Sequence, residues 1–387
     1  MSFSEWREVK LEDVVEFYNG KKRPDNYGNL PVYGGNGILD YCDSSNTSGE
    51  NIIIGRVGAY CGNVYYYDGK CWISDNAILV QAKEGYDSKY LYYHLFARNL
   101  HNLRIGSSQP LITQGILKQV QLTCPPLQEQ KAIAHILSTL DEKIEVNNKI
   151  NKTLEEMAQA IFKHWFVDFK FPNEDGEPYK SSGGEMVDSE LGPIPKGWEV
   201  GSIYSIADFI YGAPFSSKLF NELGEGLPII RIRDLKTGSP QFFTTEKHMK
   251  ETIIEAGDIL IGMDAEFRPT IWRGKKALLN QRVCLLKPKN NHVHKYYLYE
   301  LIKPYMRGLE FSKTGTTVIH FGKSDVDRIR IINPNSVLLE KFNHLVDPIH
   351  QKIVYISKEN QVLESIRDTL LPKLMSGEIR VPIDNEQ

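Results

Sequence analysis

Residues 133–165 read IAHILSTLDEKIEVNNKINKTLEEMAQAIFKHW, and residues 342–374 read FNHLVDPIHQKIVYISKENQVLESIRDTLLPKL. In each stretch, mainly apolar side chains recur at alternating steps of four and three residues, which is the spacing of a coiled-coil seam. The second set lies 209 residues after the first at every position. Two matched seams favour a helix packed against a helix over two helices that each cover only their own domain. The first seam is Ile133, Leu137, Leu140, Ile144, Asn147, Asn151, Leu154, Ala158, Ile161 and Trp165, and the second is Phe342, Val346, Ile349, Ile353, Ile356, Asn360, Leu363, Arg367, Leu370 and Leu374.

Two features interrupt these seams. Asn147, Asn151 and Asn360 occupy seam positions, where buried amides cost stability but can fix the register of two helices. Pro348 removes a backbone donor and clashes with the preceding turn. We therefore expect the second helix to start late or to kink at Pro348.

The rest of the chain also repeats, in the same order. Trp6 corresponds to Trp198, residues 30–32 to 227–229, 51–55 to 258–262, 89–92 to 295–298, 106–108 to 315–317, and Pro125 to Pro334. Each half opens with β-branched and aromatic runs broken by Gly, Pro and Asn, which is typical of short strands joined by turns. The repeat therefore predicts an α/β (α+β) protein with two tandem globular domains. Its expected parts are a first domain (1–124), a first spacer helix (125–170), a linker (171–195), a second domain (196–333), and a second spacer helix with the tail (334–387).

Size and composition agree with two folded domains. A chain of 387 residues exceeds what one core usually supports, and its 41% hydrophobic and 25% charged residues are ordinary for a globular protein. The N-terminus lacks a signal-peptide core and no apolar run reaches about 20 residues, so we expect a cytoplasmic protein without a membrane partner. The five cysteines form no C-x-x-C pair, which predicts buried reduced thiols.

The net charge of −3 is unusual for a protein that binds DNA, because lysine and arginine supply most non-specific affinity. The acidic residues are unevenly distributed, however. Residues 138–190 contain twelve acids and six lysines, so the remainder of the chain is net positive. Local basic clusters lie at residues 21–23, 231–236 and 268–276.

Several strings resemble conserved regions of Type I restriction–modification specificity subunits, the HsdS family. Residues 125–134 (PPLQEQKAIA), with GSSQP before them and FKHWFVDF after them, resemble the central conserved region. Residues 371–381 (LPKLMSGEIRV) resemble the distal conserved end, and residues 191–198 (LGPIPKGW) resemble the entry to the second recognition domain. Together with the repeat, this similarity covers nearly the whole chain.

The resemblance implies two target-recognition domains that each read one half of a split site in double-stranded DNA. It implies that two antiparallel helices, related by a pseudo-twofold axis, separate these domains and bind two methyltransferase subunits, with restriction subunits joining the complex. The chain itself would be non-catalytic and would bind no cofactor or metal, because S-adenosylmethionine, ATP and Mg²⁺ belong to the partner subunits. One departure is visible: residues 334–338 read PNSVL where 125–129 read PPLQE, so the two partner contacts need not be equal.

Candidate DNA-binding residues lie on loops, because base edges and phosphates are reached by polar side chains that project from a rigid scaffold. Two places recur in both repeats: the Gly-rich turns near the start of each domain, and the Gly-Ser/Thr segments at 106–109 and 315–320. Plain turn chemistry would also explain these residue types. The candidates are Lys21, Lys22, Arg23, Asn36, Arg56, Tyr60, Ser107, Ser108, Gln109, Arg231, Arg233, Arg268, Thr316, Thr317, His320 and Lys323.

Two other functions stay open from the residues alone: a self-sufficient DNA methyltransferase or nuclease, and a coiled-coil scaffold without a role in DNA binding. The chain contains no Asn-Pro-Pro-aromatic methylase signature, and residues 34–37 (GGNG) are too short for a dinucleotide-binding loop. His292 and His294 are an isolated pair without further residues at metal-ligand spacing. The predicted function is therefore the recognition subunit.

Overall fold

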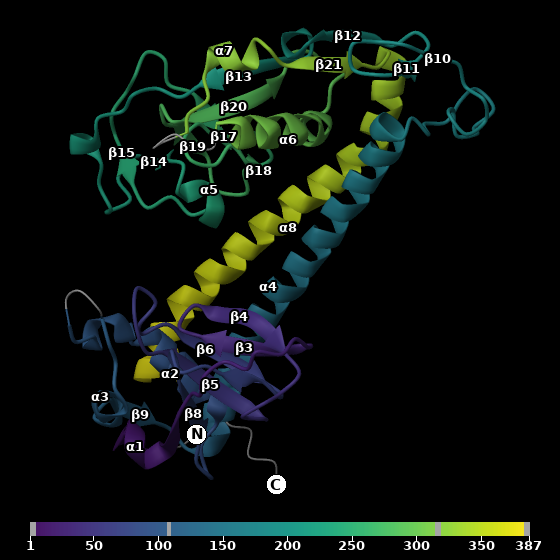
Figure 1. The fold of residues 1–387 in the computed structure, drawn as a ribbon. Helices are drawn as coiled ribbons and strands as arrows, with labels where there is room; N and C mark the ends of the chain where they lie inside the picture. Colours follow the sequence, from purple (N-terminus) through teal and green to yellow (C-terminus); the bar gives the residue numbers. More distant parts are fainter. Residues whose placement is uncertain (1–4, 107–109, 314–318, 383–387) are drawn as a thin grey trace. The chain divides into compact units, whose positions relative to one another are not determined.

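The computed structural model describes residues 5–106, 110–313 and 319–382 (Figure 1). The chain forms two compact units. Unit 1 contains the residues up to 144 together with those from 363 onward, and unit 2 contains residues 145–362. Two long helices, α4 (Leu127–Phe162) and α8 (Ser336–Ser376), contribute residues to both units.

Unit 1 is built on an antiparallel sheet of four strands in the order β2-β8-β5-β6. A smaller sheet has the order β4-β3-β7, with β3 and β7 parallel, and β1 pairs with β9. The strands are β1 (Arg7–Lys10), β2 (Val15–Asn19), β3 (Leu30–Gly34), β4 (Gly37–Cys42), β5 (Glu50–Gly55), β6 (Val64–Asp68), β7 (Trp72–Ile73), β8 (Ala77–Ala82) and β9 (Gln121–Cys124). The helices, besides parts of α4 and α8, are α1 (Leu11–Val14), α2 (Ser88–Ala97), the 3₁₀ turn η1 (Leu100–Leu103) and α3 (Gln114–Lys118).

Unit 2 repeats this topology. Its main sheet has the order β13-β20-β17-β18, its smaller sheet has the order β15-β14-β19-β16 with β14 and β19 parallel, and β12 pairs with β21. The strands are β10 (Met186–Val187), β11 (Ile194–Pro195), β12 (Glu199–Ser202), β13 (Ala207–Tyr211), β14 (Leu227–Ile230), β15 (Phe243–Thr244), β16 (Ile253–Ile254), β17 (Ile259–Gly262), β18 (Pro269–Ile271), β19 (Ala277–Leu279), β20 (Val283–Pro288) and β21 (Arg330–Asn333). The remaining helices are the π turn η2 (Lys163–Val167), the 3₁₀ turns η3 (Ile203–Ser205) and η4 (Ser217–Leu219), α5 (Asp234–Thr237), α6 (Lys295–Ser312) and α7 (Lys323–Val326). The tandem repeat predicted from the sequence is thus a repeat of strand order.

The central strand of each unit is buried on both faces. In β5, Ile52 and Ile54 share a core with α2, while Ile53 joins a second core under the smaller sheet. In β17, Ile259 and Ile261 likewise share a core with α6, and Leu260 faces the other way. Side chains alternate between the two faces of a strand, so an unbroken apolar run must be covered on both sides.

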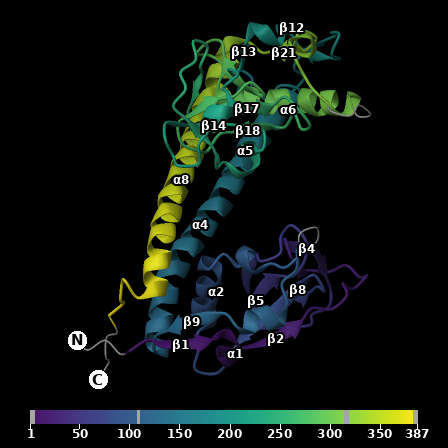
Figure 2. The ribbon, with the colours of Figure 1, turned by 90° about the vertical axis from the view of Figure 1, so that its left-hand side faces the viewer.

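The segments of α4 and α8 lie side by side within each unit (Figures 1 and 2). All twenty seam positions are buried or half-buried. In unit 2, the Nδ2 atom of Asn147 donates to Oδ1 of Asn360 at 2.8 Å, and that of Asn151 donates to Oγ of Ser357 at 3.3 Å. Because the residue number falls on α8 as it rises on α4, the two helices run antiparallel.

Of the two alternatives expected at Pro348, the late start of the second helix is wrong, and the kink stays a prediction. Helix α8 begins at Ser336 and continues through Pro348. The preceding turns are held by tertiary packing, since Phe342 and Val346 are fully buried in the core of unit 2. The proline ring itself is exposed, so the helix loses one backbone hydrogen bond there without losing its packed face.

Residues 171–195 fold onto unit 2. The ring of Phe171 stacks between Trp198 and Tyr179, with centroid distances of 5.2 and 4.7 Å.

The five cysteines are free and buried, as predicted. Among the described helices, none is long and apolar enough to cross a membrane.

Candidate nucleic-acid interface

In unit 1, four loop segments meet where β5 ends. The amide of Arg56 donates to the carbonyl of Asn76 at 2.9 Å, and the amide of Ile112 donates to the carbonyl of Arg56 at 2.9 Å. The amide of Lys21 donates to the carbonyl of Ile73 at 3.0 Å. We call this place corner 1, which comprises Lys21, Arg56–Val57, Ser74–Asn76 and Leu111–Ile112.

In unit 2, the same four segments meet where β17 ends. The amide of Met263 donates to the carbonyl of Arg282 at 3.0 Å, and the amide of Phe321 donates to the carbonyl of Met263 at 3.1 Å. The amide of Ala213 donates to the carbonyl of Leu279 at 3.0 Å. This is corner 2, which comprises Ala213, Met263–Asp264, Asn280–Arg282 and His320–Phe321, and it matches corner 1 bond for bond.

A glycine precedes the first segment of each corner, because a side chain at that position would collide with the neighbouring backbone. A Cβ atom added to Gly20 would lie 1.8 Å from the carbonyl oxygen of Ser74, and one added to Gly212 would lie 2.1 Å from that of Asn280. Only glycine allows the two backbones to approach this closely. The Gly-rich turns of the sequence therefore close the corners.

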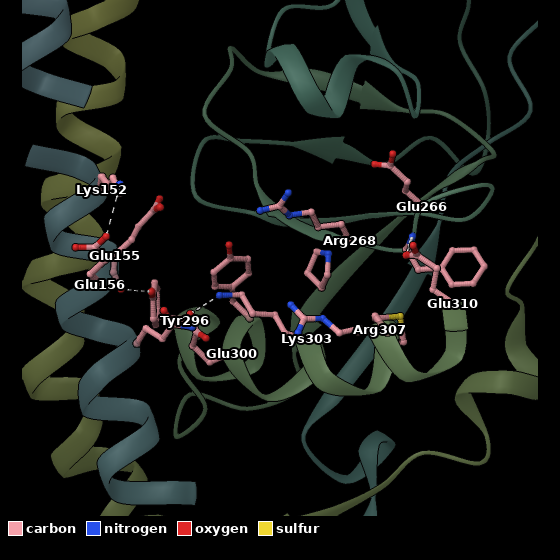
Figure 3. Close-up of a pocket in the computed structure, with 15 residues that line it drawn as sticks. Lys152, Glu155, Glu156, Glu266, Arg268, Tyr296, Glu300, Lys303, Arg307 and Glu310 are labelled. Atoms are coloured by element: carbon pink, nitrogen blue, oxygen red, sulfur yellow. Dashed lines mark hydrogen bonds and ion pairs between the residues drawn. The ribbon is translucent and has the colours of Figure 1, made fainter. Parts of the chain in front are cut away.

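Two adjoining hollows of about 720 and 850 Å³ lie in unit 2. Both are lined by Glu155 of α4, by Glu266 and Arg268 of the loop after β17, by Pro269 at the start of β18, and by Tyr299 of α6. Figure 3 shows the first hollow, where Arg268 extends from its loop toward α4. That hollow has more acidic than basic side chains in its lining, whereas the second adds Arg233, Lys236 and Arg273 and contains only two acids, Glu155 and Glu266.

Ion pairs occupy most of the charges around these hollows. Glu155 pairs with Arg273, Lys236 pairs with Glu266 at 3.0 Å, and Lys303 pairs with Glu300 at 2.6 Å. Burial raises the pKa of the Tyr296 and Tyr299 hydroxyls, so both rings are neutral. Arg233, Arg268 and Arg307 are exposed and make no ion pair with any residue that the structure describes. These guanidinium groups are available to an anionic ligand.

The candidates of unit 1 fall into two groups. Lys21 and Arg56 lie in corner 1, and Asn36 is exposed in the turn between β3 and β4. Tyr60 is half-exposed in the loop after Arg56. Arg23 pairs with Asp40, and Lys22 is exposed beside it.

The candidates of unit 2 have different surroundings. Arg233 and Arg268 line the second hollow together. Arg231 is held by Asp234 at 3.2 Å and covers the ring of Phe242, so its guanidinium is occupied within the domain. His320 bonds Asp264 at 2.6 Å in corner 2, and Lys323 is exposed at the start of α7.

Ser107, Ser108, Gln109, Thr316 and Thr317 lie outside the described residues. Asn76, Asp264 and Arg282 of the two corners are not among the candidates predicted from the sequence. The signal was present, because the polar triplets 74–76 and 280–282 each stand between two apolar strands of the repeat. Among the described residues, no group of three or more His, Cys, Asp or Glu side chains is placed to hold a metal ion.

Comparison with known proteins places this repeat in a family. The family described as "Type I restriction modification DNA specificity domain" matches residues 3–156 and again 195–344. The MjaIX specificity subunit of Methanocaldococcus jannaschii is 32% identical over 313 residues, which is 77% of this chain and 71% of that protein. The HindI specificity subunit of Haemophilus influenzae is 27% identical over 330 residues, 70% of this chain and 71% of that protein.

A solved structure shows the same fold. The crystal structure of the Type I restriction–modification S subunit from M. genitalium superposes with a TM-score of 0.58 and covers 96% of both chains at 18% identity. The sequence match spans both repeats, and the fold match spans nearly the whole chain. This chain belongs to the Type I restriction–modification DNA specificity family.

Proposed function

We propose that this chain reads a bipartite DNA site, one half with each unit, and holds the catalytic subunits of a Type I restriction–modification complex at that site. The observation that carries this proposal is the duplicated corner, in which one backbone arrangement presents two different sets of exposed side chains. A protein that reads one sequence twice would not need two sets. Methyl transfer and ATP-dependent cleavage, with their cofactors, would belong to the partner subunits.

Phosphate contact in unit 2 is assigned to the second hollow. Arg233 and Arg268 line it, are exposed and lack ion-pair partners among the described residues. Each phosphate contact adds about one unit to the slope of log affinity against log salt. Arg268→Ala should therefore weaken binding to all sequences alike and reduce that slope by about one. Arg328→Ala, which removes an exposed arginine of unit 2 that lines neither hollow, is the matched control.

The outer faces of α4 and α8 are the proposed contact for the methyltransferase subunits. Val146, Ile150 and Met157 are 49, 39 and 50% exposed and recur along one face of α4. Tyr355 and Val362 on α8 are 62 and 59% exposed, seven residues apart. Exposed apolar stripes at helical spacing are typical of surfaces that pack against further helices.

Co-purification tests this contact. Ile150→Glu should reduce recovery of the methyltransferase with the tagged chain, whereas Lys149→Glu, at the preceding exposed position, should not.

The decisive experiment for the whole function maps adenine methylation in the host genome with and without this chain. Loss of methylation at a bipartite site supports the proposal, and methyl transfer or cleavage by the purified chain alone would favour an autonomous enzyme instead.

A further inference from the structure

The two corners share one pattern of backbone hydrogen bonds but carry different side chains. The matched hydrogen bonds set Arg56 against Met263 and Asn76 against Arg282. The isolated bridges Val57–Leu111 and Asp264–His320 set Val57 against Asp264 and Leu111 against His320. At three of these four places, a neutral side chain in unit 1 stands where unit 2 has a charged or ionisable one.

Corner 2 presents Arg282, which forms an ion pair with Asp264. Asp264 accepts from the Nδ1 atom of His320 at 2.6 Å and lies 3.6 Å from the Nε atom of Arg282. The Asp264 side chain is 24% exposed, whereas that of Arg282 is 57% exposed. This ion pair restrains Arg282, whose guanidinium has five N–H donors and whose side chain is more than half exposed.

Corner 1 presents the side-chain amide of Asn76 at the place where corner 2 has Arg282. Asn76 and Asp75 are exposed in the turn before β8, and the amide of Arg56 bonds the carbonyl of Asn76. Val57 is 37% exposed, and Leu111 is paired with it across the bridge.

The four base pairs differ in the major groove in a way that fits these side chains. Guanine presents two acceptors, which suit the paired donors of arginine. Adenine presents one acceptor and one amino donor, which suit the amide of asparagine, and its partner thymine presents a methyl group that suits an apolar side chain.

We propose, resting on the function proposed above, that corner 2 reads a G·C pair through Arg282 and that corner 1 reads an A·T pair through Asn76, with Val57 against the thymine methyl. The two halves of the site therefore differ in base composition at equivalent positions. Asp264 and His320 are positioning residues for Arg282. Arg56 is not part of this comparison, because its counterpart Met263 is buried.

The test uses the complete chain in complex with its methyltransferase subunits, and selects bound duplexes from a pool with random bases. We expect the unaltered complex to enrich a bipartite site. Arg282→Asn should then change the preference at one position of one half from G toward A, by roughly 10-fold or more. Asn76→Arg should change one position of the other half in the opposite direction.

Two further variants keep the result readable. The triple replacement Asp264→Val, His320→Leu and Arg282→Asn gives corner 2 the side chains of corner 1 at the three places where a neutral residue of unit 1 corresponds to a charged or ionisable one of unit 2, so the altered half should prefer A at that position. Arg328→Asn is the matched control, because this exposed arginine lies outside both corners, and the enriched site should not change. Thermal unfolding of each variant complex shows that it is folded before its site is read.

The outcomes separate the two proposals. If the unaltered complex enriches no sequence at all, the proposed function itself fails. If it enriches a bipartite site but Arg282→Asn and Asn76→Arg change no position, or change the same half, the assignment of the corners is overturned while DNA recognition stands. If Arg282→Asn changes a position at which the unaltered complex does not prefer G, the base assignment is overturned.

Discussion

Arg380 forms a bidentate contact with Glu129, in which its Nε and Nη2 atoms donate to the two carboxylate oxygens at 2.7 and 2.8 Å. Glu129 is 1% exposed and also accepts from the indole nitrogen of Trp6 at 3.2 Å. The guanidinium of Arg380 lies 5.2 Å from the centre of the Trp6 ring. These contacts join the segments around Trp6 and Arg380 to the start of α4 in unit 1.

Arg380→Ala should destabilise unit 1 by about 3–5 kcal/mol, because it leaves a buried carboxylate without its cation. Chemical denaturation followed by tryptophan fluorescence measures this change. At the equivalent places of unit 2 stand Leu338 for Glu129 and Phe171 for Arg380, with Phe171 stacked on Trp198. The double variant Glu129→Leu with Arg380→Phe should therefore cost less than Arg380→Ala alone. A free energy of unfolding unchanged by Arg380→Ala would show that the pair does not hold the tail.

Ile353→Ala in the seam should cost about 2–5 kcal/mol, because Ile353 is fully buried and its removal leaves a cavity. Leu140 is only half-buried, so Leu140→Ala should cost clearly less. Equilibrium unfolding of both variants checks the order. Equal losses would mean that burial at these seam positions is not what stabilises the coiled coil.

Two buried histidines should make the protein sensitive to acid. Burial lowers the pKa of His94 in unit 1 and of His350 in unit 2 to about 4 each; Arg98 adds to the effect at His94, and His294 and Lys295 add to it at His350. The folded state therefore binds fewer protons than the unfolded state between about pH 4 and 6.5. The contribution of the two neutral histidines to the free energy of unfolding is fully present above about pH 6.5 and is lost as the pH falls toward 4. The full loss is about 3 kcal/mol for each histidine.

Unfolding free energies at pH 7 and pH 4.5 measure this loss. His350→Gln should reduce the difference between the two pH values, and His344→Gln, which replaces an exposed histidine of the same helix, should leave it unchanged. An identical pH dependence in the parent and in His350→Gln would rule out His350 as a source of the acid sensitivity.

The five cysteines should be unreactive in the folded protein. All are free and buried, and burial raises the pKa of Cys71 and Cys124 to about 12. Because the thiolate is the reactive form, a colorimetric thiol reagent at pH 8 should label none of them until denaturant is added. Rapid labelling without denaturant would place at least one thiol at the surface.

The helical seams and the order of the repeat could be predicted because periodicity and repetition are visible in the sequence before the chain is folded. The late start expected at Pro348 is wrong because the burial of Phe342 and Val346, a tertiary effect, outweighs one lost hydrogen bond. Less of the candidate site could be predicted. Asn76 and Arg282 look like ordinary turn residues until the backbone bonds of β5 and β17 bring them to equivalent corners, and the contact of Arg231 with Asp234 depends on a fold that spacing alone does not specify.

The division of the chain into units has a consequence for its synthesis. Unit 2 is one continuous stretch, whereas unit 1 needs residues from both sides of it. As the chain leaves the ribosome, Ile133 and Leu137 emerge long before Leu371 and Leu374, the residues with which they share a core. Domains fold as units during translation. Synthesis of unit 1 therefore begins first, but unit 1 can complete its fold only after all of unit 2 has been made. A message cut short after residue 362 would thus yield a chain whose distal unit can be complete and whose amino-terminal unit cannot.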